Sequence, residues 1–370
     1  MPETTITGVQ PGQTDYDYLV FIGRFQPFHF GHKRVIDQAL MQSKKVIVLI
    51  GSSNEPRTLH NPFSFQERRD MISNSFQDYH FVNKLIIEPL EDTGENDQQW
   101  VANVQRIVTD RILLDLPGNA PGQTLHGMGE KKIGLIGCAK DSTSYYLKLF
   151  PMWGNEAVQF LDPINATDIR EEYFPNKISW VSELGDTPDQ TPTATWEFLK
   201  DFERTEDFTN LWGEYTHQKW YDKQWADAPY PPIFVTTDAV IIQSGHVLLV
   251  ERAAYPGKGL IALPGGFLKK TERILDGMIR ELREETKIRV PDPVLRGSIK
   301  DIRVFDAPNR SSRGRTITHA FMIKLEDRTE LPEIKGSDDA KRAFWLPLGE
   351  LDRSVMFEDH YHVIQSMLNV

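Results

Sequence analysis

The sequence predicts two α/β domains in succession, an N-terminal domain built on a buried parallel sheet and a C-terminal α/β sandwich. Four short apolar runs of the kind that form buried parallel strands occur in the first 140 residues, at 19–22, 45–50, 85–89 and 132–137. A stretch rich in Asp, Thr and Pro, residues 185–192, then interrupts the pattern. Beyond it, residues 234–242 and 246–251 form two predicted strands around a Ser-Gly hairpin turn.

Length and composition agree with two domains, because a chain of 370 residues can bury two ordinary cores. The expected parts are a loose polar lead-in at 1–17, a first domain at 18–184, a linker with an aromatic-rich helical segment at 185–232, and a second domain at 233–370. Aromatic residues at helical spacing usually belong to a core or an interface, so this segment predicts a structural clamp between the domains.

The composition excludes several classes of protein. A net charge of −11 argues against a nucleic-acid-binding surface, which needs a positive face. No apolar run reaches membrane-spanning length, and the N-terminus lacks the basic-then-apolar pattern of a signal peptide. The single cysteine, Cys138, excludes an intramolecular disulfide and fits a reducing compartment. We therefore expect a cytoplasmic protein without nucleic-acid or membrane partners, and a homo-oligomer is compatible with the sequence.

The segment 20–32, VFIGRFQPFHFGH, combines a strand, a Gly-bearing turn and a helix start. Such a junction suits phosphate, because the free N–H groups of a first helical turn point at whatever lies beyond the strand end. His29 and His32 can meet phosphate oxygens where charge builds up during phosphoryl transfer, and Gly31 lets a nucleotide approach the backbone. For HxGH alone, an ordinary turn with solvated histidines is the alternative.

The longer string GRFQPFHFGH, residues 23–32, resembles the first motif of the HxGH nucleotidyltransferase superfamily, in the form of archaeal-type nicotinamide mononucleotide adenylyltransferases. The resemblance implies a Rossmann-like domain whose two histidines bind ATP phosphates without a covalent enzyme intermediate. It also implies that neighbouring residues contact the nucleotide: Gly23, Arg24, Phe25, Gln26 and Gly31.

The end of the second predicted strand supplies further candidates, because ligands gather at the carboxyl ends of parallel strands. Ser52 and Asn61 lie in this region. The segment 51–72 resembles the family's second block, which carries an arginine for the transferring phosphates, and Arg57 takes that role by the resemblance. His60 stands where some relatives place this arginine, and a solvated loop arginine is the alternative.

Asp92 and Trp100 follow the third predicted strand and are candidates for binding the second substrate. An indole beside carboxylates suits stacking on a flat cationic ring such as nicotinamide. Family members use a tryptophan in this region in that way. Taken alone, a Trp at the start of an amphipathic helix is more often part of a core.

Two later segments complete the first resemblance. The residues GCAKD…SYYLKLFP resemble a block in which an aspartate, here Asp141, helps to hold the dinucleotide. Residues 164–170 resemble the ISTTxxR block, with Asn165 in place of the expected Ser and an Ala in place of Thr or Gly. Asn165 or Thr167 can cap the following helix, and Arg170 can reach back to the same phosphate oxygens.

The second domain places three carboxylates on one face of a helix predicted over 271–286, for which Thr271 can act as N-cap. These residues are Glu281, Glu284 and Glu285. They repel one another unless a hard divalent cation, Mg²⁺ or Mn²⁺, lies between them. Arg280 can bridge to Glu284 one turn on.

This helix and the preceding Gly265 and Gly266 match the Nudix box, GX5EX7REUXEEXGU, except that Lys287 replaces the last Gly. The resemblance implies a Nudix fold that holds its metal on the three glutamates. Residues 305–316 resemble the segment that ADP-ribose-hydrolysing Nudix proteins place near the substrate, where Arg310 and Arg313 suit a diphosphate. By the same resemblance, residues 335–339 correspond to the loop that supplies a general base in some relatives.

Together the motifs resemble the bifunctional nicotinamide mononucleotide adenylyltransferase/Nudix ADP-ribose pyrophosphatase family over nearly the whole chain. The resemblance implies small-molecule partners, namely ATP, nicotinamide mononucleotide, NAD and ADP-ribose. Two alternatives stay open. The first domain could transfer an adenylyl or cytidylyl group to another phosphorylated small molecule, and the second could sense ADP-ribose without cleaving it.

Overall fold

The computed structural model describes residues 15–77, 83–94, 96–115, 131–137, 148–158, 164–176, 190–336 and 340–368. The chain divides into two compact units. The first unit contains Met1–Asn54 and Phe63–Arg204, and the second contains Glu55–Pro62 and Thr205–Val370. The division after Arg204 falls inside the segment 185–232, so one helix of that segment belongs to each unit.

The first unit is built on a five-stranded parallel sheet in the order β3-β2-β1-β4-β5. Its strands are β1 (Tyr16–Gly23), β2 (Ser43–Ile50), β3 (Leu85–Pro89), β4 (Ile133–Gly137) and β5 (Gly154–Ala157). The four predicted strands are confirmed, and β5 is an additional edge strand. The strand order reverses at β1, and ligands of such sheets bind at the carboxyl ends of the strands beside that reversal.

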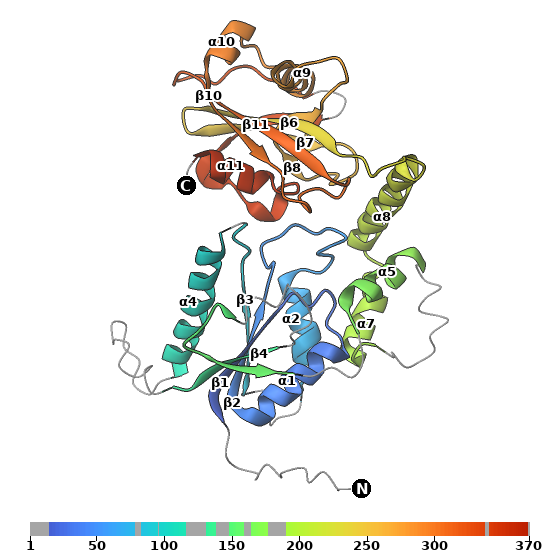
Figure 1. Ribbon diagram of the computed structural model, residues 1–370, viewed down its shortest axis with the longest axis vertical. Coiled ribbons are helices and arrows are strands. Elements are labelled where there is room, and N and C mark those ends of the chain that lie inside the picture. The colour runs from blue at the N-terminus through green and yellow to red at the C-terminus, as the bar shows by residue number, and fades with distance from the viewer. Residues whose placement is uncertain are drawn as a thin grey trace. The chain divides into compact units, whose positions relative to one another are not determined.

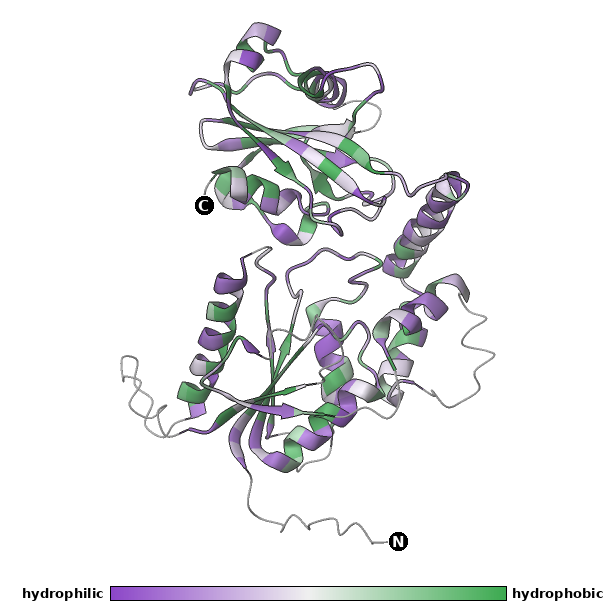
Figure 2. Cartoon of the chain, in the orientation of Figure 1, coloured by the Kyte–Doolittle hydropathy of each residue, from purple (hydrophilic) through white to green (hydrophobic). Residues whose placement is uncertain are grey.

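Helices cover both faces of this sheet, as Figure 1 shows for α4 on one side and α1 on the other. The helices of the first unit are α1 (Phe30–Gln42), α2 (Phe65–Asn74), α4 (Asp97–Asp115), α5 (Ala166–Asn176) and α7 (Thr193–Phe202). Alternate residues of β1, including Val20 and Ile22, pack against Val104 and Val108 of α4 in one core. Hydrophobic residues are concentrated in the strands, as the colouring of Figure 2 shows. The predicted Rossmann-like parallel sheet is confirmed.

The second unit is a mixed α/β sandwich, as predicted. Its sheet follows the path β10-β11-β6-β7-β12, with β8 beside β7 and β9 beside β6. The strands are β6 (Phe234–Gln243), β7 (His246–Arg252), β8 (Ile261–Ala262), β9 (Gly265–Phe267), β10 (Ile299–Phe305), β11 (Thr316–Lys324) and β12 (Ala340–Pro347). The helices are α8 (Glu206–Trp225), α9 (Ile274–Thr286), α10 (Asp292–Gly297) and α11 (His360–Leu368). Helices α9 and α11 bury separate cores on opposite faces of the sheet (Figure 1).

The aromatic-rich segment packs through small residues as well as rings. Trp196 and Phe202 of α7 are buried, and Phe202 contacts the edge of the Phe63 ring. In α8, a Cβ at Gly213 would lie only 2.4 Å from the Tyr255 hydroxyl, so the helix lies directly on the β7–β8 loop. The main-chain N–H of Gly257 donates to the Glu214 carboxylate at 3.0 Å. These contacts make α8 an integral part of the second unit.

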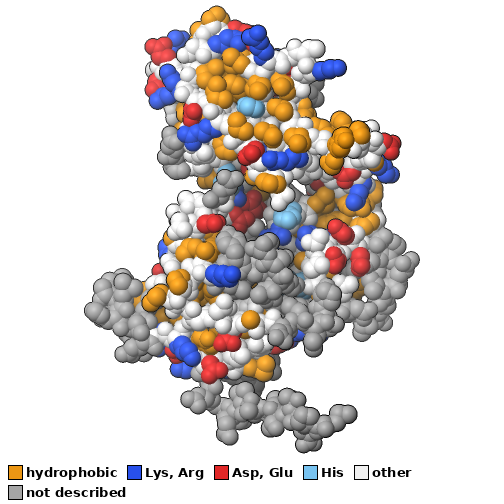
Figure 3. All heavy atoms as spheres, in the orientation of Figure 1, with side chains coloured by type: hydrophobic (Ala, Val, Ile, Leu, Met, Phe, Trp, Pro, Cys, Tyr) orange, Lys and Arg blue, Asp and Glu red, His pale blue; other side chains and the backbone are white. Residues whose placement is uncertain are grey.

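The surface shows charged side chains of both signs between apolar ones on the face drawn in Figure 3. Exposed apolar residues include Ile302 and Val304 on the edge strand β10. Among the helices in the described ranges, none combines the length and the apolar character needed to cross a bilayer.

Candidate active sites

The turn after β1 brings the two predicted histidines together. Phe25 adopts a left-handed backbone with φ of 54° and folds its buried ring back over Gly23, where a Cβ would lie 2.9 Å from that ring. His29 is the N-cap residue of α1, and His32 lies in its first turn. The two imidazoles stack with ring centroids 3.6 Å apart, and Phe25 contacts His32 edge-on at 4.8 Å. The histidines therefore sit where the first amides of α1 can meet an anion.

A second layer of residues braces this turn. The Gln26 side chain exchanges two 2.9 Å hydrogen bonds with the backbone of Phe63, donating to its carbonyl and accepting from its N–H. Arg170 donates to the Gln26 carbonyl at 2.6 Å and to the Thr167 hydroxyl at 3.4 Å. Burial, and then the neighbouring Arg24, lower the pKa of Arg170 to about 10. The buried Arg170 and the more exposed Arg24 place positive charge beside the turn, which favours an anionic ligand.

Asn165 is the residue that caps α5, because its Oδ1 accepts a hydrogen bond from the N–H of Asp168 at 2.9 Å. The sequence left Asn165 and Thr167 as alternatives for this role. The hydroxyl of Thr167 instead accepts from Arg170. The ISTTxxR-like segment thus keeps its capping chemistry despite the substituted residues.

The structure also joins Ser52 with Asp92. The Ser52 hydroxyl donates to one Asp92 oxygen at 2.6 Å, and the Ser52 N–H donates to the other at 3.3 Å. The Asp92 N–H donates to the side chain of Asn54 at 3.3 Å. Burial lowers the pKa of Arg24, and the negative charge of Asp92 opposes this shift. Asp92 is thus fixed at the carboxyl end of the sheet and interacts electrostatically with Arg24.

Trp100 is half-buried against the core of the first unit, with its ring centroid 6.2 Å from that of Phe150. Phe150 in turn stacks on Trp153 at 4.7 Å. Trp100 therefore combines a core contact with a partly open ring. Its role in stacking on nicotinamide stays a prediction.

Two other predicted residues lie in a different environment. Arg57 and Asn61 belong to the segment Glu55–Pro62, which groups with the second unit. Arg57 donates to the carbonyl of Pro62 and forms an ion pair with Asp207 at 3.1 Å. The N–H of Asn61 donates to the Thr58 hydroxyl at 3.1 Å. Asp141 lies outside the described residues.

Sequence reasoning missed Arg68, which is only 1% exposed on α2. The sequence did contain a signal for its burial. Met71 and Ile72 lie three and four residues after Arg68, so all three side chains share the buried face of α2. A basic residue on a buried helical stripe needs partners that satisfy its N–H groups.

In the second unit, the Nudix-box segment folds β9 against α9. The Gly265 N–H donates to the Glu285 carboxylate at 3.0 Å, and a Cβ at Gly266 would lie 2.7 Å from the Glu281 carboxyl carbon. Burial raises the pKa of Glu285 to about 8, and the nearby charges of Glu281 and Asp238 add to this rise. Burial also raises the pKa of Glu281. Crowded buried carboxylates of this kind favour a bound cation.

Arg280 pairs with two of the three predicted metal-binding glutamates and with Glu272. It donates to Glu272 at 2.6 and 2.9 Å, to Glu281 at 2.6 Å and to Glu284 at 3.0 Å. The predicted Arg280–Glu284 bridge is confirmed. Glu284 is more open than its neighbours, with 53% of its side chain exposed. In the described part of the chain no three His, Cys, Asp or Glu side chains form a ready cage, yet the all-oxygen donor set fits Mg²⁺ or Mn²⁺.

The ends of α9 differ in how well the sequence predicted them. Thr271 as N-cap is wrong, because α9 begins at Ile274 with Arg273 as the cap residue. Glu272 accepts from the N–H of Lys269 at 2.7 Å and is also held by Arg280, which keeps these residues in a turn. At the other end, Lys287 takes the left-handed conformation expected of the missing Gly, with φ of 48°.

The two predicted arginines after β10 behave differently from each other. Arg310 is buried and makes a bidentate pair with Asp359 at 2.7 and 2.8 Å, which fixes the loop to α11. The guanidinium of Arg313 lies 4.9 Å from the Phe267 ring and 5.7 Å from the Phe357 ring. Arg313 therefore borders β9 and is the better placed of the two to meet a ligand.

Arg252, at the end of β7, is a further residue that sequence reasoning missed. Its guanidinium lies 4.0 Å over the Phe357 ring, and its Nε donates to the Pro256 carbonyl at 2.8 Å. Burial and Arg313 lower its pKa, while Glu358 and Glu285 oppose this shift. Arg252 thus places positive charge near the Glu285 carboxylate. Of the predicted base loop, the Lys335 N–H donates to the Thr286 carbonyl at 2.8 Å, and residues 337–339 lie outside the described ranges.

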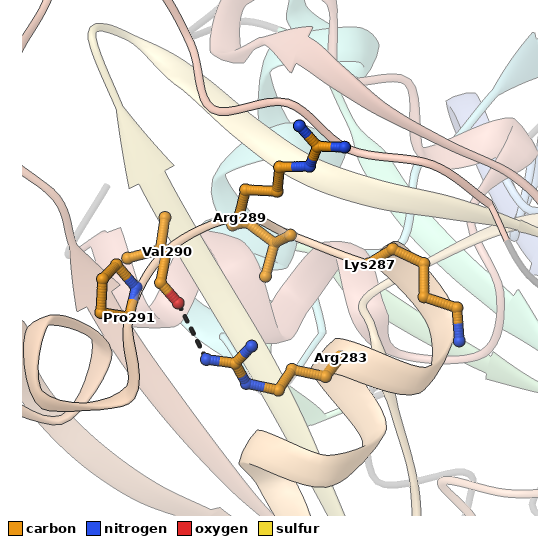
Figure 4. A pocket seen from close by; sticks show the side chains of 6 residues that line it. Arg283, Lys287, Arg289, Val290 and Pro291 are labelled. Atoms are coloured by element: carbon orange, nitrogen blue, oxygen red, sulfur yellow. Dashed lines mark hydrogen bonds between the residues drawn. The ribbon is translucent and has the colours of Figure 1, made fainter.

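A surface pocket of about 440 Å³ opens at the C-terminal end of α9 (Figure 4). Its lining consists of Arg283, Lys287, Ile288, Arg289, Val290 and Pro291. Arg283 donates to the Val290 carbonyl at 2.9 Å, the dashed contact in Figure 4, and also pairs with Asp292. None of the Nudix-box carboxylates lines this pocket, so it is separate from the candidate metal site.

Comparison with known proteins assigns a relative to each part of the chain. The family model of the NUDIX domain matches residues 232–367, and that of cytidylyltransferase-like proteins matches residues 20–113. The nicotinamide/nicotinic acid mononucleotide adenylyltransferase of Acinetobacter baylyi is 37% identical over 209 residues, which cover 55% of this chain and 95% of the relative. The ADP-ribose pyrophosphatase of Methanocaldococcus jannaschii is 31% identical over 134 residues, which cover 36% of this chain and 72% of the relative.

Solved structures of one relative match nearly the whole chain. The bifunctional NMN adenylyltransferase/ADP ribose pyrophosphatase of Francisella tularensis, complexed with AMP and a manganese ion, is 38% identical with a TM-score of 0.83. The match covers 96% of this chain and 99% of that chain. The protein therefore belongs to the family of bifunctional nicotinamide mononucleotide adenylyltransferase/Nudix ADP-ribose pyrophosphatases.

Proposed function

We propose that this chain is a bifunctional enzyme of NAD metabolism. The N-terminal domain makes NAD and pyrophosphate from ATP and nicotinamide mononucleotide. The C-terminal Nudix domain hydrolyses ADP-ribose to AMP and ribose 5-phosphate. The observation that supports this proposal is that motif residues come together in each unit, as the stacked His29–His32 pair in one and the Gly265–Glu285 contact in the other.

In the N-terminal domain, the phosphate of nicotinamide mononucleotide attacks the α-phosphorus of ATP in line, and pyrophosphate leaves. Catalysis consists of positioning and charge stabilisation. His29 and His32 meet the ATP phosphates at the start of α1, with Arg170 beside the same turn. Asp92, held by Ser52, and the open part of the Trp100 ring bind the nicotinamide nucleotide. Arg57 is a further candidate for the transferring phosphates.

In the Nudix domain, Glu281, Glu284 and Glu285 would hold the divalent metal. When bound, the metal polarises the water that attacks phosphorus. Arg252 and Arg313 supply positive charge for the diphosphate, and the Gly265 N–H fixes Glu285. The related Francisella structure holds manganese, and we propose Mg²⁺ as an equally suitable ion for this oxygen-only donor set.

Two features support these activities over the alternatives. The Ser52–Asp92 pair and Trp100 favour a nicotinamide nucleotide over another phosphorylated substrate for the first domain. The sequence keeps all three of the predicted metal-binding glutamates, Glu281, Glu284 and Glu285, which favours a hydrolase over a module that only senses ADP-ribose. The single cysteine supports a reducing, cytoplasmic location. A homo-oligomer stays a prediction.

The test uses the full chain with Mg²⁺ or Mn²⁺. One reaction contains ATP and nicotinamide mononucleotide, a second replaces ATP with CTP, a third replaces nicotinamide mononucleotide with another sugar phosphate, and a fourth contains ADP-ribose alone. Mass spectrometry of the products should show NAD only in the first and AMP with ribose 5-phosphate in the fourth. A cytidylyl product, or bound but intact ADP-ribose, would favour the corresponding alternative.

A further inference from the structure

Arg68 is a buried cation whose hydrogen bonds reach the ends of two strands. Its guanidinium donates to the carbonyls of Arg24 and Gly51, both at 2.7 Å, and to the carbonyl of Ser52 at 3.1 Å. A fourth bond, from Nε to the Ser64 carbonyl at 3.1 Å, stays within the start of α2. Arg24 follows β1 and Gly51 follows β2, so one side chain ties together the two turns that border the nucleotide site.

The carbonyls that Arg68 holds flank two left-handed residues. Phe25, next to Arg24, has φ of 54°, and Ser52 has φ of 49°. L-residues disfavour this conformation because Cβ approaches the following carbonyl oxygen. Such turns persist only where surrounding contacts fix them. Arg68 holds both turns by donating to the carbonyl of Arg24, next to Phe25, and to the carbonyl of Ser52.

The turn at Ser52 determines where Asp92 lies. Its conformation directs both the Ser52 hydroxyl and the Ser52 N–H at the Asp92 carboxylate, at 2.6 and 3.3 Å. The positive charge of Arg68 also attracts Asp92, which partly offsets the lowering of the Arg68 pKa by burial, to about 10.

The first turn of α2, which carries Arg68, is held in place by its own hydrogen bonds. Ser64 and Glu67 form a capping box at the start of α2, in which the Ser64 N–H donates to Glu67 at 2.6 Å and the Glu67 N–H donates to the Ser64 hydroxyl at 3.3 Å. A chain of contacts therefore connects the capped start of α2, through Arg68 and the turn at Ser52, to the Asp92 carboxylate.

We propose that Arg68 is a positioning residue of the nucleotidyltransferase site, which sets the turns after β1 and β2 and thereby orients Asp92 toward nicotinamide mononucleotide. This inference rests on the proposed adenylyltransferase function. It assigns Arg68 no contact with the substrate, because the side chain is buried and makes four hydrogen bonds to main-chain carbonyls.

The test is a double-mutant cycle of Arg68→Lys and Asp92→Asn in the full chain. Lysine keeps the charge, but its single nitrogen cannot reproduce the fork that reaches several carbonyls. Arg68→Lys should raise the KM for nicotinamide mononucleotide about tenfold and the KM for ATP much less. In the Asp92→Asn background the same change should have little further effect on that KM, because the carboxylate through which Arg68 acts is gone.

The controls separate positioning from folding. Arg69→Lys changes the exposed neighbour on the same helix and should match wild type. ADP-ribose hydrolysis should be unchanged in every variant, and each variant should stay folded at the assay temperature, although Arg68→Lys should unfold at a lower temperature because buried carbonyls lose their partners. Should Arg68→Lys fail to fold, Ser52→Ala removes only the hydroxyl bond to Asp92, and it should also raise the KM for nicotinamide mononucleotide without adding to Asp92→Asn.

Three outcomes overturn the inference: an unchanged KM in Arg68→Lys, an unchanged KM in Ser52→Ala, or effects of Arg68→Lys and Asp92→Asn that multiply. A wild-type protein that makes no NAD in the same assay would instead overturn the proposed function. The two failures are therefore distinguishable.

Discussion

The main-chain N–H of Gly265 and the carboxylate of Glu285 are joined by a 3.0 Å hydrogen bond between β9 and α9. This contact fixes a carboxylate whose pKa burial raises to about 8. The hydrogen bond from Gly265 favours the charged form of Glu285 and so lowers its pKa. This lowering is smaller than the rise that burial and the negative charges of Glu281 and Asp238 cause. The Nudix helix therefore presents carboxylates that gain from a divalent cation.

Glu284→Gln should weaken divalent-metal binding and lower ADP-ribose hydrolysis about 100-fold or more, because one proposed metal ligand loses its charge. Glu284 accepts a hydrogen bond from Arg280 at 3.0 Å and is half-exposed, so the amide should keep the fold intact. Thermal unfolding with chelator and with excess Mg²⁺, alongside the hydrolysis assay, measures both effects. Wild-type hydrolysis in the variant would remove Glu284 from the metal site.

Lys287→Gly should stabilise the second unit by about 0.5–1 kcal/mol, because glycine adopts the observed φ of 48° without the steric cost that a Cβ imposes. Ser298→Gly is the matched control. Ser298 is the C-cap of α10 with φ of −95°, so glycine there adds only flexibility and should destabilise. Urea unfolding of both variants gives the two free-energy changes. If glycine destabilised the protein at both positions, the left-handed cap of α9 would carry no strain.

His360→Asn should make the stability of the second unit less dependent on pH. The N–H of Leu263 donates to Nδ1 of His360 at 2.8 Å, and burial lowers the pKa of His360 to about 3. The unfolded chain, with a His pKa near 6.5, binds more protons between about pH 3 and 6.5. The contribution of neutral His360 is therefore present above pH 6.5 and is lost as the pH falls toward 3.

Asparagine keeps an acceptor but cannot gain a proton in this range. We expect the variant to be less stable than wild type by about 1–3 kcal/mol at pH 7.5, with a smaller gap at pH 5. Urea unfolding at the two pH values measures the gap. A gap that stays constant would show that His360 does not titrate on unfolding.

Trp100→Ala should raise the KM for nicotinamide mononucleotide several-fold to tens-fold and change the KM for ATP less, because stacking on a cationic ring is worth about 0.5–2 kcal/mol. Trp100 also packs near Phe150, so a loss of stability is expected as well. Trp153→Ala removes the other ring beside Phe150 and serves as the packing control. Equal kinetic effects in both variants would make Trp100 a core residue only.

The sequence predicted the strands and junctions whose cause is local. The apolar run that ends at Gly23 and the helix that starts after His29 carry their own signals, and both appear in the structure. The strand β5 carries none, since GNEA is polar and half-exposed. Its position depends on Tyr16, whose ring fills the space that side chains at Gly134 and Gly154 would need. A contact across more than 100 residues leaves no local pattern.

The candidate sites divide in the same way. Motif spacing placed His29, His32 and the Nudix glutamates on the correct elements, because each set lies on one helix. The helical spacing of Arg68 signalled its burial but not its partners, which are carbonyls from distant turns, and Arg252 was missed because the Phe357 ring that it contacts lies far away in the sequence. Thr271 was misplaced because the Arg280–Glu272 pair, eight residues apart, keeps the preceding turn out of the helix.

The central claim is that one chain carries two chemistries on separate sets of residues. Its most direct test is a matrix of wild type, His32→Ala, Glu284→Gln and the double variant, each assayed for NAD synthesis and for ADP-ribose hydrolysis. We predict that His32→Ala loses NAD synthesis by about 100-fold or more and keeps hydrolysis, that Glu284→Gln does the reverse, and that the double variant loses both. A single variant that loses both activities while its unfolding transition is unchanged would contradict the claim.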